Sequence, residues 1–191
     1  MKIGLFFGSF NPVHSGHMVI AQYMAEFTDL EQVWLVVSPQ NPLKPKATLL
    51  SDVHRLALVR HAVGYYRKLK ASNIEFKLSQ PSYTVTTLVH LKEKFPQHTF
   101  ALILGSDNLD TFHKWKNYEQ ILAEHELYVY PRKGSTGGNL LHNKSVKVVD
   151  APLMEISASF IRNAIRDKKD VHYMMPEAVW EYIKEMNFYK K

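Results

Sequence analysis

The sequence predicts a doubly wound α/β domain built on a mainly parallel sheet. Short apolar runs that end at glycine or proline alternate with stretches of helical periodicity. This alternation is typical of strands joined by right-handed helical crossovers, which cover both faces of a parallel sheet. The 191 residues include no cysteine, and a chain of this length buries a sufficient core without disulfides. We therefore expect a single domain over residues 1–191, in which residues 152–191 form a small helical portion.

The first half of the chain supplies three expected strands and three expected helices. Residues 3–7 are apolar throughout and stop at Gly8, whereas residues 74–78 alternate apolar and polar side chains like a strand with one exposed face. Ser51 is suited to cap a helix, and the prolines and lysines of residues 40–46 indicate a loop. The strands are expected at 3–7, 33–37 and 74–78, and the helices at 16–28, 52–66 and 84–95.

The second half repeats the same alternation. Residues 100–104 are fully apolar and end at Gly105, and Pro131 closes the apolar run at 127–130. Three glycines among polar residues indicate a flexible loop over residues 134–145. The strands are expected at 100–104, 127–130 and 146–149, and the helices at 118–125, 157–167 and 177–186.

The charge balance indicates an anionic partner. Lysine and arginine number 24 against 18 acidic residues, which gives a formal net charge of +6 and a pI of about 9.3. Either a nucleic acid or a phosphorylated small molecule would suit that surface. The first apolar run, residues 3–7, is too short for a signal-peptide core or a membrane span, so we expect a soluble cytoplasmic protein without a membrane partner. The oligomeric state stays open.

The loop after the first expected strand has the composition of a phosphate-binding loop. Residues 8–17 read GSFNPVHSGH. Gly8 lets the backbone turn and approach a ligand, and the following helix begins at Gly16 and His17, where unpaired N–H groups and the helix dipole favour an anion. His14 and His17 add donors, and either can carry positive charge near neutral pH. The loop matches neither the P-loop nor the GxGxxG pattern, so it predicts a different kind of nucleotide site.

This loop resembles the signature of the nucleotidylyltransferase superfamily, in which Gly-[Ser/Thr]-Phe-Asp-Pro-x-His-x-Gly-His follows the first strand. Asn11 stands where that family mostly has Asp, and Phe7 stands where many members have Gly. Neither change touches the two histidines. The resemblance implies a Rossmann-like nucleotidylyltransferase fold and an ATP site at this loop.

A second segment near the C-terminus also resembles that superfamily. Residues 156–162 read ISASFIR, where Ser157 can cap a helix and Arg162 lies on the same side of that helix as Ser159. A hydroxyl, helix amides and a guanidinium together make a phosphate clamp. In the superfamily the matching segment grips the β- and γ-phosphates of the nucleotide.

The middle of the chain resembles the nicotinate-mononucleotide adenylyltransferases of bacterial NAD synthesis. The segments that carry this likeness are PSYTVTTL at 81–88, GSDNL at 105–109 with Trp115 beyond it, and YPR at 130–132. In that family these segments form the mononucleotide pocket. The residues themselves suit that role, because an indole face stacks on a pyridinium ring and a helix start attracts a carboxylate.

The expected site combines these segments. We expect His17, His14 and Arg162 to be catalytic, with His17 at the α-phosphate. Lys44 lies in a loop where Leu43 replaces the histidine that is usual in relatives. The expected ATP-binding residues are Gly8, Ser9, Phe10, His14, His17, Lys44, Gly105, Asp107, Ile156, Ser159 and Arg162. The expected mononucleotide-binding residues are Asn11, Tyr83, Thr84, Trp115 and Arg132. No metal-binding carboxylate cage stands out, so Mg²⁺ is expected to arrive on the triphosphate.

The resemblance implies adenylyl transfer from ATP to nicotinate mononucleotide, giving deamido-NAD and pyrophosphate. An enzyme like the phosphopantetheine adenylyltransferase, or one that uses nicotinamide mononucleotide, would share both phosphate motifs. A basic nucleic-acid-binding module is the alternative from a different class. The basic residues are spread along the chain and no nucleic-acid motif stands out, so we expect no nucleic acid partner.

Overall fold

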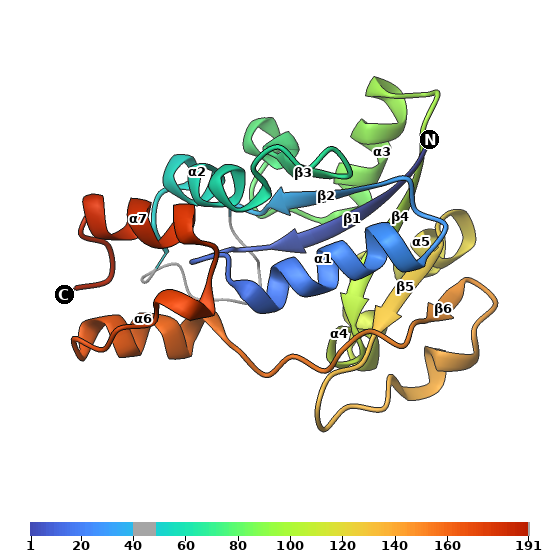
Figure 1. The fold of residues 1–191 in the computed structure, drawn as a ribbon. Coiled ribbons are helices and arrows are strands. Elements are labelled where there is room, and N and C mark those ends of the chain that lie inside the picture. Colours follow the sequence, from blue (N-terminus) through green and yellow to red (C-terminus); the bar gives the residue numbers. More distant parts are fainter. Residues whose placement is uncertain (40–48, 191) are drawn as a thin grey trace.

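One six-stranded sheet forms the centre of the molecule, and all of its neighbouring strands run parallel. The computed structural model describes residues 1–39 and 49–190, whose arrangement Figure 1 shows. The strands are β1 (Lys2–Gly8), β2 (Gln32–Val37), β3 (Leu69–Ser72), β4 (Thr99–Gly105), β5 (Leu127–Tyr130) and β6 (Val146–Val148). Their spatial order is β3-β2-β1-β4-β5-β6. The chain thus winds outward from β1 in both directions, which confirms the doubly wound parallel sheet.

Helices cover both faces of this sheet. Within the described residues they are α1 (Ser15–Phe27), α2 (Asp52–Val63), α3 (Thr84–Lys94), α4 (Ser106–Asp110), α5 (Tyr118–Glu124), α6 (Ala158–Arg166) and α7 (Glu177–Glu185). Phe6 and Leu35 belong to a buried cluster with residues of α1, α2, α6 and α7, whereas Leu5 and Trp34 belong to a second cluster with residues of α3, α4 and α5. Because successive strand side chains point to opposite faces, each central strand must be apolar on both sides, as the sequence is.

The prediction of a strand at residues 74–78 is wrong. Residues Ile74–Lys77 form a 3₁₀ turn, and the strand lies earlier, at β3. Ile74 packs against one hydrophobic cluster and Phe76 against the other, so the alternation comes from a turn that spans the edge of the sheet. Strand β3 lies at the edge of the sheet and pairs with β2 alone. Its only large apolar residue is Leu69, so it lacks the continuous apolar run of a central strand.

The end of one helix and the content of one loop also differ from expectation. Helix α2 ends at Val63 because Gly64 adopts a φ of +54°, and the Gly64 amide donates to the Arg60 carbonyl at 3.0 Å. The expected loop at 134–145 contains a 3₁₀ turn, Gly138–His142. Leu140 and Leu141 of that turn pack against the cluster beneath α3, α4 and α5.

The C-terminal helical portion shares the main core. Buried residues Ile161 of α6 and Val179 of α7 belong to the same cluster as Phe6 and Leu35. Figure 1 shows α6 and α7 together near the C-terminus. Helix α7 also packs against α2. This packing brings the second phosphate motif to the end of the sheet where β1 stops.

Candidate active site

A cleft opens at the carboxyl ends of the central strands. The order of the strands reverses between β1 and β4, which is where ligands bind in open parallel sheets. The cleft has about 700 Å³ of empty space, part of it open solvent. It is lined by Phe6, Phe7, Gly8, Ser9, Ser38, Leu102, Ile103, Leu104, Asn108, Trp115 and Tyr130.

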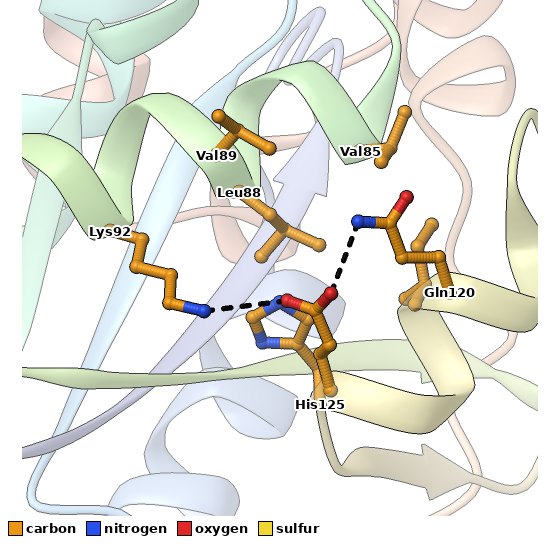
Figure 2. A pocket seen from close by; sticks show the side chains of 8 residues that line it. Val85, Leu88, Val89, Lys92, Gln120 and His125 are labelled. Atoms are coloured by element: carbon orange, nitrogen blue, oxygen red, sulfur yellow. Dashed lines mark hydrogen bonds and ion pairs between the residues drawn. The ribbon is translucent and has the colours of Figure 1, made fainter.

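A second hollow lies between α3 and α5, away from that cleft. Lys92 and Gln120, which Figure 2 labels, donate to the carboxylate of Glu124 at 3.5 and 3.1 Å. Behind them, the His125 ring donates from Nδ1 to the Phe100 carbonyl at 2.8 Å. The hollow has room for about one water molecule, so it is not a substrate site.

The two histidines of the first loop pack as one unit at the start of α1. The His14 amide donates to Nδ1 of His17 at 3.3 Å, which leaves the ring proton of a neutral His17 on Nε2. Their ring centroids are 3.8 Å apart. A Cβ at Gly16 would come within 3.1 Å of the His14 ring, so the glycine between them makes room for this packing. The ring of Phe10, only 2% exposed, lies beneath His17 with centroids 5.1 Å apart.

His14 is neutral at physiological pH, contrary to the expectation that either histidine can be charged there. Burial, with a smaller contribution from the Arg132 charge, lowers the pKa of His14 to about 4. The side chain is 4% exposed. Its Nδ1 is buried and finds no hydrogen-bond partner within the described ranges.

We expect this buried imidazole to make the unfolding free energy sensitive to acid. The unfolded chain takes up a proton near pH 6.5, while folded His14 stays neutral until about pH 4, so the stability falls as the pH drops through this window. The expected loss is about 2 kcal/mol at pH 5. Urea unfolding of the protein and its His14→Gln variant at pH 7 and pH 5 measures this. An equal loss in both proteins would show that His14 is not the group responsible.

The second motif meets the first loop directly. Ser157 caps α6 by accepting from the Phe160 amide at 3.2 Å. Arg162 donates from Nη2 to Ser159 Oγ at 3.2 Å and from Nη1 to the Asn11 carbonyl at 2.8 Å. Two segments 151 residues apart in the chain therefore share one guanidinium. Ile156 is half-buried and packs against the core beside them.

Of the residues expected to bind the mononucleotide, Trp115 lines the cleft. Trp115 is half-buried, lines the cleft and packs on Phe112 with centroids 4.8 Å apart. Tyr83 occupies the N-cap position of α3, immediately before Thr84, and its ring lies 4.6 Å from Nζ of Lys116. Tyr83 and Thr84 are not among the residues that line the cleft, and their role at the mononucleotide stays a prediction.

Arg132 and Asp107 lie together over the end of β4. Their Nε and Oδ1 atoms are 3.8 Å apart. A Cβ at Gly105 would come within 2.7 Å of the Arg132 side chain, so this glycine permits the approach. Nη1 of Arg132 donates to the Met154 carbonyl at 3.3 Å, and its charge acts on His14. The charge of Arg132 therefore acts on the loop of residues 8–17, and its role at the mononucleotide stays a prediction.

Asn11 is buried rather than lining the cleft. It is 3% exposed, and its Oδ1 accepts from the Leu50 amide at 3.3 Å and from the Tyr189 hydroxyl at 2.9 Å. In this state Asn11 holds neighbouring segments together, and its role at the mononucleotide stays a prediction. Lys44 lies outside the described residues.

Arg55, which was not predicted from the sequence as a functional residue, connects the loop after β1 to the loop after β2. Arg55 is completely buried in α2 and donates to the carbonyls of Ser9, Ser38, Pro39 and Leu50 at 2.6, 2.8, 3.2 and 3.1 Å. It also pairs with Oδ1 of Asp52 at 2.5 Å. The only signal in the sequence is an arginine directly before the apolar run of residues 56–59.

The described ranges hold neither a metal cage nor a membrane span. Residues 1–39 and 49–190 contain no group of three or more His, Cys, Asp or Glu side chains that could hold a metal ion. None of the helices in these ranges combines the length and apolar character needed to cross a bilayer.

Comparison with known proteins agrees with this geometry. The family model described as cytidylyltransferase-like matches residues 5–164. A probable nicotinate-nucleotide adenylyltransferase of Flavobacterium johnsoniae is 57% identical over 193 residues, which cover 100% of both chains. One of Christiangramia forsetii is 54% identical, covering 99% of this chain and 98% of that one. The fold is similar to a Plasmodium falciparum nicotinic acid mononucleotide adenylyltransferase complexed with NaAD, with a TM-score of 0.83 at 20% identity, covering 99% of this chain and 97% of that one. The chain belongs to the cytidylyltransferase-like family, among the nicotinate-nucleotide adenylyltransferases.

Proposed function

We propose that this protein transfers the adenylyl group of ATP to nicotinate mononucleotide, giving deamido-NAD and pyrophosphate. The observation that carries this proposal is the meeting of two phosphate motifs beside an aromatic cleft. Arg162 of the second motif bonds the Asn11 carbonyl of the first loop, and Trp115 lines the cleft at the strand ends. The names of the curated relatives support the same activity.

The chemistry requires alignment and charge stabilisation more than proton transfer. The phosphate of the mononucleotide is already anionic and attacks the α-phosphorus of ATP, while the bond to the bridging oxygen breaks and pyrophosphate leaves. His17 Nε2 is proposed to donate to an α-phosphate oxygen, where negative charge grows. Arg162 and Ser159 would hold the departing β- and γ-phosphates. No covalent intermediate or general base is needed.

Mg²⁺ is proposed to enter on the triphosphate rather than on a protein cage. Asp107 and Asp52, two acidic groups near the loops, are each paired with an arginine. The donors left in this region are hydroxyl, imidazole and amide groups, which suit phosphate oxygens better than a divalent ion. When bound, the ion supplies positive charge that screens the phosphates for attack.

A panel of acceptors tests the proposal. The protein would be incubated with ATP, Mg²⁺ and, separately, nicotinate mononucleotide, nicotinamide mononucleotide or phosphopantetheine, with pyrophosphate release as the readout. Fastest release with nicotinate mononucleotide supports the assignment. Fastest release with phosphopantetheine would move the chain to another substrate class within the family.

We expect catalytic efficiency with the acid mononucleotide to exceed that with the amide by roughly tenfold to more than a hundredfold. Tyr83 and Thr84 begin α3, where the backbone offers only donors and a partial positive charge. A carboxylate accepts from these donors, whereas a carboxamide must leave an NH₂ unpaired, at a cost of about 1–3 kcal/mol. Comparing kcat/KM on the two mononucleotides measures the preference.

Trp115→Ala is the matched control for that preference. Stacking does not distinguish acid from amide, so the variant should lose efficiency on both substrates to a similar extent. Equal efficiencies of the unaltered protein on the two mononucleotides would contradict acid selectivity. An unaffected Trp115→Ala variant would remove the indole from the pocket.

A further inference from the structure

The C-terminal end of the chain reaches back to the first loop. Beyond α7, Tyr189 donates its hydroxyl to Asn11 Oδ1 at 2.9 Å, across 178 residues of sequence. Phe188 and Tyr189 have ring centroids 6.1 Å apart, and Phe188 also packs against His54 of α2 and Tyr182 of α7, at 4.9 and 5.8 Å. Ring packing therefore holds this end of the chain in place independently of the hydroxyl bond.

Asn11 is the point where four segments meet. Its Oδ1 accepts from both Tyr189 and the Leu50 amide, and its carbonyl accepts from Arg162. An amide oxygen has two acceptor sites, so it can accept from both donors at once. Phe10, directly before it, has a φ of +46°, which is uncommon for a residue with a side chain and must be held by its surroundings.

We propose that Tyr189 is a positioning residue for the phosphate loop, acting through Asn11 to keep residues 8–17 and Arg162 in the arrangement that receives ATP. The inference rests on the proposed function, because it assigns Tyr189 to the ATP half of that reaction. Losing the hydroxyl would remove the hydrogen bond between Tyr189 and Asn11 Oδ1 and loosen the loop on which His14 and His17 stand.

The Tyr189 hydroxyl is suited to act as a permanent donor. Burial raises the pKa of Tyr189 above its usual value, while the charges of Arg162 and Arg55 oppose this rise. The group therefore stays protonated at the pH values where the enzyme would work, and its bond to Asn11 does not switch with pH.

The test compares Tyr189→Phe with Tyr182→Phe. The hydroxyl of Tyr182 forms a hydrogen bond with His54 Nδ1 at 3.0 Å, so this control loses a similar C-terminal hydrogen bond without touching residues 8–17.

Two quantities would be measured. The first is the Kd of a non-reacting ATP analogue with an α,β-methylene bridge, by calorimetry without mononucleotide. The second is kcat/KM for each substrate. Tyr189→Phe should weaken analogue binding and lower kcat/KM for ATP about three- to tenfold, with the melting temperature nearly unchanged. Tyr182→Phe should leave both ATP quantities unchanged.

Each remaining outcome has a definite meaning. Unchanged ATP affinity in Tyr189→Phe overturns the positioning role, and an equal loss in Tyr182→Phe shows general loosening of the C-terminal end instead. If the unaltered protein binds the analogue but releases no pyrophosphate with any acceptor, the proposed function fails and the calorimetric comparison still decides the role of Tyr189. Failure of the unaltered protein to bind the analogue overturns both.

Discussion

Replacing His17 with alanine is expected to lower the turnover number about 10²–10³-fold, while the affinity for ATP changes much less. The proposed contact between His17 and the α-phosphate is strongest in the transition state. Charge at the α-phosphate is redistributed as the bond to pyrophosphate breaks, so a donor placed there stabilises the transition state more than bound ATP. Steady-state kinetics with both substrates, together with the Kd of the non-reacting ATP analogue, separates the two effects.

A second variant distinguishes chemistry from helix capping at this position. His17 Nδ1 accepts the His14 amide at 3.3 Å, which is a capping role that an asparagine oxygen can also fill. His17→Asn should therefore restore the thermal stability lost in His17→Ala, yet stay nearly as slow, because it lacks a donor at the place of Nε2. An asparagine variant with near-normal turnover would show that His17 is a cap and that the proposed contact with the α-phosphate is wrong.

Replacing Arg55 with methionine is expected to destabilise the fold by about 3–5 kcal/mol, although Arg55 touches no substrate in the proposed mechanism. The side chain is fully buried and provides the hydrogen bonds of four loop carbonyls, on Ser9, Ser38, Pro39 and Leu50. Methionine fills similar space but leaves those oxygens without their donor. In a chain of this size the melting temperature should fall by about 6–20 °C.

Two matched variants complete that measurement. Asp52→Asn removes the charge that pairs with Arg55 but keeps an acceptor, and Asp52 is 38% exposed, so the loss should stay below about 1 kcal/mol. Arg55→Lys keeps the charge but offers a single ammonium group in place of a fork, so it should resemble Arg55→Met more than the unaltered protein. A melting temperature of Arg55→Met within two or three degrees of the unaltered protein would show that water replaces the guanidinium at these carbonyls.

The same variants report on the cleft. Arg55 connects the start of the first loop, at Ser9, to Ser38, which directly follows β2, and both residues line the cleft. Without these hydrogen bonds, the backbone amides of residues 8–17 should exchange their hydrogens faster, even below the melting temperature. Asp52→Asn should show no such change.

Features that depend on near neighbours in the chain could be predicted from the sequence. The apolar runs at 3–7, 33–37 and 100–104 and the helical periodicity between them were sufficient to predict a doubly wound parallel sheet, which the structure confirms. Gly16 and the two histidines lie within one turn of helix, so their spacing, together with their place after a strand and the glycines of the loop, predicted a common site. Local steric fit and side-chain periodicity are properties of short segments, and a sequence displays them directly.

Burial and distant hydrogen-bond partners were decided only by the tertiary structure. The alternation at 74–78 resembled a strand because Ile74 and Phe76 pack on opposite sides of a turn, which only the folded sheet edge reveals. His14 loses its charge because the fold buries it beside Arg132. Arg55 and Tyr189 reach partners 46 and 178 residues away. The free energy of a buried polar group depends on which atoms surround it after folding, and those atoms come from segments that no local pattern connects.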